Sequence, residues 1–192
     1  MKKILIGTHN RGKFKEIAYL LSKKIKKVSP VSLKIKSPKE TGKSFIANSK
    51  LKANYFSKFV NYSVISDDSG LCIKSLNNKP GIYSARLAKK KGGFTNAMKY
   101  LLMKLEKKRN RSATFICCLS FKSPNQKIIN VVGQIKGTIS KKILGKKGFG
   151  YDPIFIPKNR KKTFGETPKF KKMKMDHRFI AFRKLKKRVK IL

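Results

Sequence analysis

Two carboxylates lie side by side at Asp67 and Asp68, in a chain of 192 residues with only eight Asp and Glu. They follow the apolar pair at residues 64–65 and precede a Ser-Gly pair, a pattern typical of a strand that ends in a turn. Carboxylates at a strand end suit Mg²⁺, which takes one or two of them and completes its shell with substrate phosphates. A solvated turn capped by an Asp explains the same residues, so the pair alone leaves both readings open.

A polar segment from Thr8 to Lys13 follows a strand predicted for residues 3–7 and leads into a helix. Asn10 or Thr8 is the candidate N-cap of that helix. Backbone N–H groups at a helix start favour anions, and Lys13 adds a positive charge one turn in. The spacing of Gly and Lys does not match a P-loop, and an ordinary strand-to-helix turn also fits.

Glu40 precedes a second helix, predicted for residues 44–59, whose apolar positions form an imperfect helical stripe. A carboxylate near a helix N-terminus is favoured by the helix dipole, which gives Glu40 a structural explanation as well. Asn48 and Lys52 are four residues apart and share one face of this helix. That face is either solvated or directed into a site.

Two further segments carry candidate binding residues. Gly148 and Gly150 bracket Phe149, which lets the backbone bend sharply and present an aromatic ring. A base stacked on Phe149 or Tyr151 would contribute about 1–3 kcal/mol, although a loop whose aromatic rings cover the core has the same sequence. His177 starts a helix predicted to reach residue 185, where it is either structural or in contact with an anion or carbonyl.

The predicted elements form one mixed α/β sheet in a single domain over residues 1–192. Strands and helices alternate in the first half, and a helix is predicted for residues 95–107. Strands are predicted for residues 71–76, 113–121 and 127–139, the second of them buried on both faces and paired with the third in a hairpin.

The net charge is +42, from 50 Lys and Arg against 8 Asp and Glu, and it is spread along the whole chain. Such a charge predicts non-specific binding of nucleic acid, but a general enrichment in lysine produces the same balance without that function. Cys72, Cys117 and Cys118 fit no disulfide framework or zinc spacing and are predicted to be buried in strands. No apolar run approaches about 18 residues, so we expect a cytoplasmic protein that does not bind membranes.

Together these segments resemble the inosine triphosphate pyrophosphatase family, which hydrolyses non-standard purine nucleoside triphosphates. The similarity runs nearly end to end, with the motifs in family order and at family spacing. They are Thr8 to Lys13, Glu40-Thr41-Gly42, Asn48 to Ala53, Asp67 to Leu71, Pro80 to Arg86, Gly148 to Phe155 and His177-Arg178.

The resemblance implies an elongated mixed β-sheet flanked by helices, with two lobes and a central nucleotide cleft. It also implies a homodimer and Mg²⁺-dependent hydrolysis of ITP, dITP and XTP to the monophosphate and pyrophosphate. Two alternatives are a basic nucleic-acid-binding protein on the same fold and a nucleotide pyrophosphatase for other modified bases.

By the same resemblance, Glu40 and Asp68 hold the metal, and Asp68 also orients or deprotonates the attacking water. The first loop, Lys52 and Ser69 bind the triphosphate, Phe149 stacks on the purine, and His177 with Arg178 reads the 6-keto edge. The residues expected to bind substrate are Thr8, His9, Asn10, Arg11, Gly12, Lys13, Lys52, Ser69, Phe149, Gly150, Tyr151, Asp152, Lys172, His177 and Arg178.

Two positions depart from the family pattern. His9 stands where the first loop of the family usually has Gly, and Asp176 stands where the family usually has Ser before His-Arg. The first change affects the approach of the backbone to phosphate, and the second adds a negative charge that nearby lysines could offset.

Overall fold

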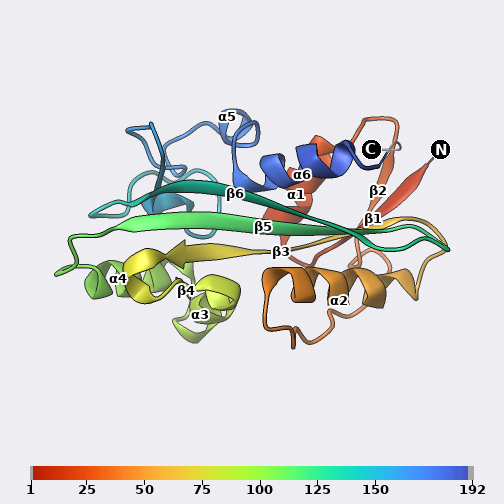
Figure 1. Cartoon of the computed structure of the whole chain (residues 1–192), viewed down its shortest axis with the longest axis horizontal. Helices are drawn as coiled ribbons and strands as arrows, with labels where there is room; N and C mark the ends of the chain where they lie inside the picture. The colour runs from red at the N-terminus through yellow and green to blue at the C-terminus, as the bar shows by residue number, and fades with distance from the viewer. Residues whose placement is uncertain (1, 190–192) are drawn as a thin grey trace. The chain divides into compact units, whose positions relative to one another are not determined.

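A computed structural model describes residues 2–189, which contain seven strands in one mixed sheet (Figure 1). The strand order is β2-β1-β3-β5-β6-β7, and β4 pairs with β3. β1 is parallel to β2 and β3, whereas β4 is antiparallel to β3 and β7 to β6. The predicted mixed α/β sheet is therefore confirmed. The strands are β1 (Lys3–Gly7), β2 (Lys26–Val28), β3 (Val64–Ile73), β4 (Lys79–Pro80), β5 (Ser112–Lys122), β6 (Ile129–Ile139) and β7 (Phe155–Pro157).

The four helices predicted from the sequence begin close to where it places them, and the first two are capped by nearby side chains, whereas α3 and α5 were not predicted. The side chain of Asn10 accepts a hydrogen bond from the main-chain N of Lys13 (3.0 Å) and caps the first helix, and Ser44 caps the second in the same way. The helices are α1 (Arg11–Leu20), α2 (Phe45–Ser57), α3 (Ser84–Lys90), α4 (Phe94–Lys104), α5 (Lys169–Lys172) and α6 (His177–Lys186). None of these described helices is long and apolar enough to cross a membrane.

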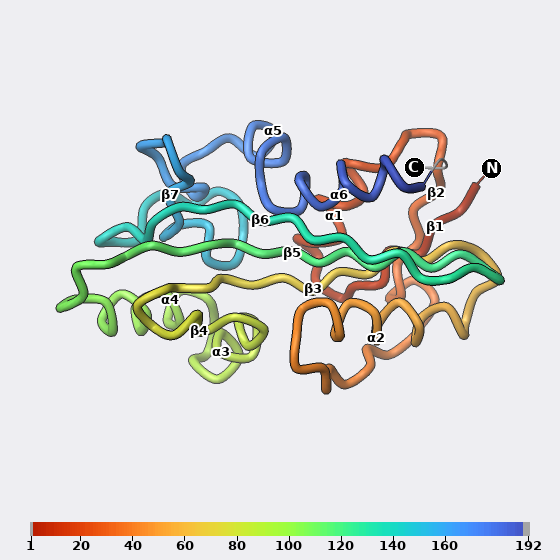
Figure 2. The backbone as a smooth tube through the Cα atoms, in the orientation of Figure 1, coloured from red at the N-terminus to blue at the C-terminus, as the bar shows by residue number. Residues whose placement is uncertain are grey.

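The chain divides into two compact units, and three strands pass from one to the other (Figure 2). Unit 1 consists of residues 2–68, 117–133 and 178–189, and unit 2 of residues 69–116 and 134–177. The strands that change unit are β3, β5 and β6. Each unit has an apolar core of its own, and the single domain over residues 1–192 stays a prediction.

The core of unit 1 lies on both faces of β1. Side chains alternate along a strand, so Ile4 and Ile6 pack in a cluster with residues of α1 and α6, and Leu5 packs on the other face against Phe56 of α2. Figure 1 shows α1 and α6 on one side of these strands and α2 on the other. The side chains of residues 67 and 68 in the neighbouring strand β3 likewise point to opposite faces of the sheet.

The core of unit 2 is formed by one large cluster. Leu71 and Ile73 of β3 and Phe115 of β5 pack with the buried face of α4, which includes Met98 and Leu101.

The three cysteines are buried in β3 and β5 with free thiols, as predicted.

One predicted boundary is wrong. The strand does not end in a turn at Asp67 and Asp68, because β3 continues to Ile73, and the strand predicted for residues 71–76 stops there. Gly70 marks a close backbone approach instead of a turn, since a Cβ atom at this position would collide with the carbonyl oxygen of Gly81. Both carboxylates are therefore buried inside a strand.

The burial of Phe56 in α2 and the exposure of Phe59, just after this helix, predict the effects of two substitutions. Phe56 is fully buried, so Phe56→Ala should lower the free energy of unfolding by about 3–5 kcal/mol. Phe59 is 52% exposed, and Phe59→Ala should cost less than about 1 kcal/mol. Urea denaturation of both variants measures the difference, and equal losses would contradict this packing.

Candidate functional site

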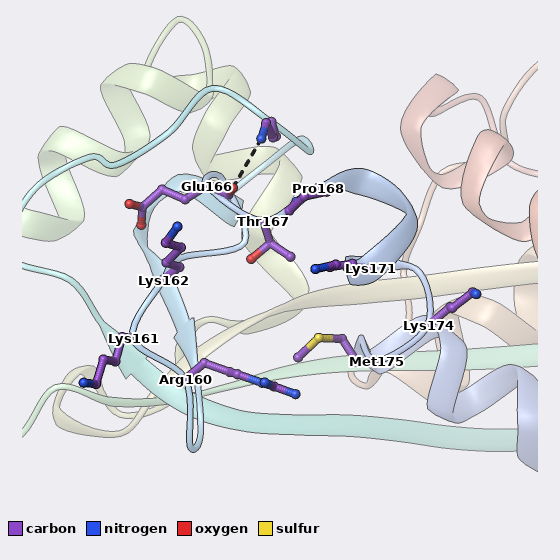
Figure 3. Close-up of a pocket in the computed structure, with 10 residues that line it drawn as sticks. Arg160, Lys161, Lys162, Glu166, Thr167, Pro168, Lys171, Lys174 and Met175 are labelled. Atoms are coloured by element: carbon purple, nitrogen blue, oxygen red, sulfur yellow. Dashed lines mark hydrogen bonds between the residues drawn. The ribbon is translucent and has the colours of Figure 1, made fainter.

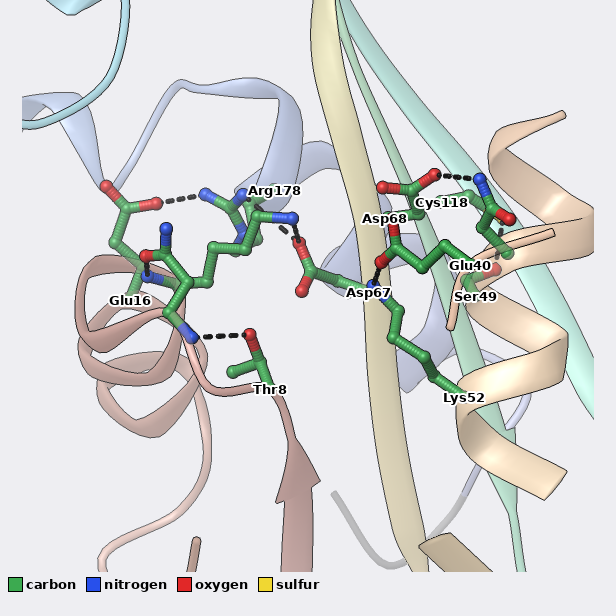
Figure 4. Close-up of polar contacts among 12 residues, drawn as sticks. Thr8, Glu16, Glu40, Ser49, Lys52, Asp67, Asp68, Cys118 and Arg178 are labelled. Atoms are coloured by element: carbon green, nitrogen blue, oxygen red, sulfur yellow. Dashed lines mark hydrogen bonds and ion pairs between the residues drawn. The ribbon is translucent and has the colours of Figure 1, made fainter. Parts of the chain in front are cut away.

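Asp67 and Asp68 point to opposite faces of β3 (Figure 4). This follows from the alternation of side chains along a strand. Asp67 is 0% exposed and Asp68 4% exposed, so each carboxylate needs its own partners to offset the loss of water. The two partner sets differ, and so do the properties of the two acids.

Asp67 is held in a buried ionic network of unit 1. Its Oδ2 atom lies 3.2 Å from Nζ of Lys13 and 3.3 Å from a guanidinium nitrogen of Arg178, and a second guanidinium nitrogen of Arg178 pairs with Glu16. Burial alone would raise the pKa of Asp67, but Lys13 and Arg178 outweigh it and hold this pKa well below its usual range. Asp67 is therefore ionised, and it fixes both cations.

Asp68 faces α2, and its partners offset less of the cost of burying its charge than the partners of Asp67 do. Its Oδ2 atom accepts a hydrogen bond from Nδ2 of Asn48 (3.0 Å). Burial raises the pKa of Asp68, and the charge of Glu40 adds to this, while Lys13 and Lys52 oppose it. A carboxylate whose pKa is raised is a better proton acceptor, which suits a group that handles a water molecule.

Glu40, Lys52 and Asp68 come together in unit 1. Nζ of Lys52 lies 2.5 Å from Oε1 of Glu40, and Figure 4 shows Glu40 and Asp68 on the side of β3 that faces α2. Burial would lower the pKa of Lys52, but Asp67, Asp68 and Glu40 outweigh it and raise this pKa. Lys52 is therefore a permanent cation between carboxylates.

The donor set of Glu40 and Asp68 fits Mg²⁺. Both are hard oxygen ligands on one face of β3, and a bound cation would reduce the repulsion between their like charges. Residues 2–189 contain no group of three or more His, Cys, Asp or Glu side chains that could hold a metal. An ion bound here would therefore need further oxygen ligands from water or from substrate phosphates.

The first loop is ordered by its own polar groups. Oγ1 of Thr8 accepts from the main-chain N of Asn10 (3.2 Å), and Asn10 in turn caps α1. His9 is exposed, with its Nε2 atom 2.9 Å from the carbonyl oxygen of Ile35. Arg11 is also exposed, so Lys13 is the cation of this loop that reaches the carboxylates.

Unit 2 brings together Phe149, Asp152 and Lys172. Oδ2 of Asp152 accepts from the main-chain N of Phe149 (2.8 Å) and lies 2.7 Å from Nζ of Lys172. The same ammonium group lies 4.7 Å from the centre of the Phe149 ring. Gly150 follows with a φ of +66°, which glycine adopts without strain.

Tyr151 and His177 are mainly core residues of unit 2. The Tyr151 hydroxyl donates to the carbonyl oxygen of Ser84 (2.9 Å), and burial raises its pKa. The ring of His177 stacks on Phe115, with 4.8 Å between ring centres. Of the two aromatic residues predicted as stacking partners, Phe149 is therefore the more accessible.

The extra charge of Asp176 is offset. Its Oδ2 atom lies 3.8 Å from Nζ of Lys172, which therefore contacts both Asp152 and Asp176. The remaining predicted residues divide by unit: Arg178 and Gly12 lie in unit 1, and Ser69, which follows Asp68 in β3, lies in unit 2.

Unit 2 also has a basic pocket that is lined by other residues (Figure 3). None of the residues predicted to bind substrate lines it. Its one carboxylate, Glu166, accepts from the main-chain N of Thr163 (2.8 Å), so the pocket is strongly cationic and attractive to polyanions. The Lys and Arg residues that line it are Lys147, Arg160, Lys161, Lys162, Lys171 and Lys174.

Comparison with known proteins identifies the family. The model of the Ham1 family matches residues 4–188. The chain belongs to the Ham1 family. Its relatives include a dITP/XTP pyrophosphatase of Bacillus subtilis, 40% identical over 97% of this chain and 96% of the relative. Another, from Borrelia duttonii, has the same name and is 43% identical over 97% of this chain and 96% of the relative.

Solved Ham1 structures have the same fold. The HAM1 protein of Coxiella burnetii is 30% identical, with a TM-score of 0.89 over all of both chains. The Ham1 protein of Staphylococcus aureus is 33% identical, with a TM-score of 0.87 over 98% of each chain. The family recognised from the sequence motifs is thus confirmed.

Sequence reasoning missed Glu16, and it noted Asp67 and Asn48 without predicting the contacts that they make. Glu16 and Asp67 hold Arg178, and Asn48 holds Asp68. The spacing of Asn48 and Lys52 was the available signal for a shared face on α2, and both are buried. No sequence signal links Glu16 to Arg178, because they are 162 residues apart.

The ionic network predicts how Asp67→Asn changes stability with pH. The variant leaves Lys13 and Arg178 under-compensated, so at pH 7 the free energy of unfolding should fall by about 3–5 kcal/mol. Because the pKa of Asp67 is lowered in the folded state, its stabilisation is complete above the unfolded pKa of about 3.9 and is lost as the pH falls below it.

Thermal or urea unfolding of the Asp67→Asn variant and wild type from pH 8 to 3 checks this. The deficit should be constant down to about pH 5 and shrink below about pH 4. Glu106→Gln, at an exposed acid, is the control and should show no deficit. A deficit at Asp67 that grows on acidification would contradict the network.

Proposed function

We propose that this Ham1-family chain hydrolyses ITP, dITP and XTP to the nucleoside monophosphate and pyrophosphate. The relatives with this activity in their names match nearly the whole chain, which supports the reaction class. The observation that carries the proposal is the group of Glu40, Lys52 and Asp68 beside Lys13 in unit 1. It combines two carboxylates with two cations, as hydrolysis of a phosphoric anhydride requires.

Asp68 orients the attacking water in this proposal. The water oxygen forms a bond to the α-phosphorus while the bond to the pyrophosphate oxygen breaks, and Asp68 accepts the proton. The raised pKa of Asp68 favours that transfer, and the hydrogen bond from Asn48 holds the carboxylate in place.

Lys13, Lys52 and the start of α1 bind the triphosphate. Lys52 contacts Glu40, Lys13 contacts Asp67 and also lowers the pKa of Asp68, and the N-terminus of α1 has main-chain N–H groups suited to anions. They offset the charge that accumulates on the leaving pyrophosphate. Mg²⁺ held by Glu40 and Asp68 would supply further charge neutralisation and orient the phosphates.

Phe149, Lys172, His177 and Arg178 recognise the base. Phe149 offers an accessible ring for stacking, and the buried cation Lys172 beside it offers a donor to a keto oxygen. Donors aimed at the 6-keto oxygen would be left unpaired by the 6-amino group of adenine, which selects against ATP. Arg178 is fixed by Glu16 and Asp67, so its orientation is set before substrate binds.

The resemblance to the family further predicts a homodimer, and the cysteines and the short apolar runs of the sequence predict a cytoplasmic location. The charge of +42 predicts weak binding of nucleic acid that falls steeply with salt, because it depends on release of counterions. Such binding would accompany catalysis and does not replace it. A dedicated nucleic-acid-binding protein would instead bind equally well without Glu40 and Asp68.

Pyrophosphate release from a panel of triphosphates tests the proposed function. With Mg²⁺, ITP, dITP and XTP should each be hydrolysed with a kcat/KM at least about 100-fold above that for ATP, because a site built around donors leaves them unpaired with the wrong base. GTP and other modified triphosphates complete the panel, and omission of Mg²⁺ should abolish turnover. Equal turnover of all nucleotides, or none, would overturn the assignment.

Asp68→Asn should separate activity from stability. Loss of the proton acceptor should lower kcat by at least about 100-fold. The raised pKa of Asp68 means that its charged form is disfavoured in the folded state, so at pH 7 the variant should be no less stable than wild type. Wild-type rates in the variant would remove Asp68 from the mechanism.

A further inference from the structure

A single buried amide connects the segment that carries Glu40 to the strand that carries Asp68. The side chain of Asn48 is in α2 and is 0% exposed. Its Oδ1 atom accepts from the main-chain N of Gly42 (2.8 Å), and its Nδ2 atom donates to Oδ2 of Asp68 (3.0 Å). Both ends of the amide are therefore used, one by the segment that carries Glu40 and one by Asp68.

The chemistry of this position requires a donor and an acceptor on one short side chain. A carboxylate could accept from Gly42 but could not donate to Asp68, and an aliphatic side chain could do neither. Residue 42 also packs tightly, since a Cβ atom there would lie 2.6 Å from Oδ1 of Asn48 and 2.8 Å from Cβ of Ala47. The contact to Gly42 thus holds the main chain against the first turn of α2.

Lys52 holds the same segment at a second point, but in a different way. It contacts the carboxylate of Glu40, an oxygen that a bound cation would also use. Asn48 contacts only the main chain of the segment, through the N–H of Gly42. The Asn48 contact therefore does not compete with an ion for Glu40.

We propose that Asn48 is a positioning residue that sets the separation of the Glu40 and Asp68 carboxylates and so determines the affinity for the divalent ion. The proposal rests on the metal-dependent function proposed above. In it, Asn48 does not contact the ion but holds Asp68 and the segment that carries Glu40 in place. Hydrogen-bond partners behind metal ligands typically contribute about 10–100-fold in metal affinity. A loss of that size is expected when Asn48 is removed.

The direct test is Mn²⁺ binding to the full-length protein without nucleotide, followed by electron paramagnetic resonance. Asn48→Ser keeps a small polar side chain, and Asn48→Leu removes both hydrogen bonds at similar size. Both should weaken Mn²⁺ binding by about 10–100-fold. Asp68→Asn should abolish Mn²⁺ binding at this site. The binding that is lost in this variant therefore identifies the binding that belongs to the site.

Ser44→Ala is the matched control on the same helix. Ser44 caps α2 by accepting from the main-chain N of Ala47 (3.1 Å), so the variant loses this cap without touching Asp68 or Gly42. It should bind Mn²⁺ like wild type. Circular dichroism establishes that each variant is folded, and Asn48→Ser remains informative if Asn48→Leu does not fold.

A kinetic measurement separates positioning from substrate binding. The Asn48 variants should raise the Mg²⁺ concentration for half-maximal ITP hydrolysis by the same factor as they weaken Mn²⁺ binding, with little change in KM for ITP at saturating Mg²⁺. Wild-type Mn²⁺ affinity in Asn48→Ser, or an equal loss in Ser44→Ala, would overturn the proposal. Weaker Mn²⁺ binding in the Asn48 variants, together with a wild-type protein that shows no preference for ITP over ATP, would overturn the proposed substrate and still support the role of Asn48.

Discussion

The structure of unit 1 depends on the burial of two consecutive carboxylates in the middle of one strand. Burying a charge is costly unless it is paired, and strand geometry sends Asp67 and Asp68 to opposite faces, so their direct hydrogen-bond and ion-pair partners differ. Lys13 and Arg178 lower the pKa of Asp67, whereas burial and Glu40 raise that of Asp68. Neighbouring acids thus acquire opposite pKa shifts, which suit the structural role of Asp67 and the proton-accepting role proposed for Asp68.

The helix α2 also buries polar side chains that need partners of their own. Beside Asn48 and Lys52, the hydroxyl of Ser49 contacts Sγ of Cys118 (3.2 Å) and Oγ of Ser120 (2.8 Å), and Ser120 donates to Asn130 (2.6 Å). Such networks stabilise when every member is satisfied and are costly when one partner is lost. The face of α2 that meets the sheet is therefore specified as closely as an apolar core.

Features encoded by neighbouring residues could be predicted from the sequence. The first strand, the Asn10 cap and the burial of the cysteines follow from short-range patterns, and the family follows from motifs in order. The continuation of β3 through Asp67 was not predicted, because it depends on Lys13 and Arg178, which are far away in the chain.

The face of α2 and the role of Tyr151 show a second limit. The apolar stripe predicted for α2 includes Ile46, which is 44% exposed, because the buried face is polar at Asn48 and Lys52. Tyr151 was expected to contact substrate, and in unit 2 its hydroxyl binds the main chain of Ser84. The periodicity of apolar residues predicts which face of a helix is buried only when the residues on that face are apolar.

The distribution of the few acids has a consequence for solution behaviour. Five of the eight carboxylates are buried, so the exterior is almost entirely cationic and repels itself. Added electrolyte screens charges at the surface far more than pairs in the interior. Moderate ionic strength should therefore stabilise the folded state of this protein. In a protein that depends on surface ion pairs, the same salt would lower stability. The buried acids are Glu16, Asp67, Asp68, Asp152 and Asp176.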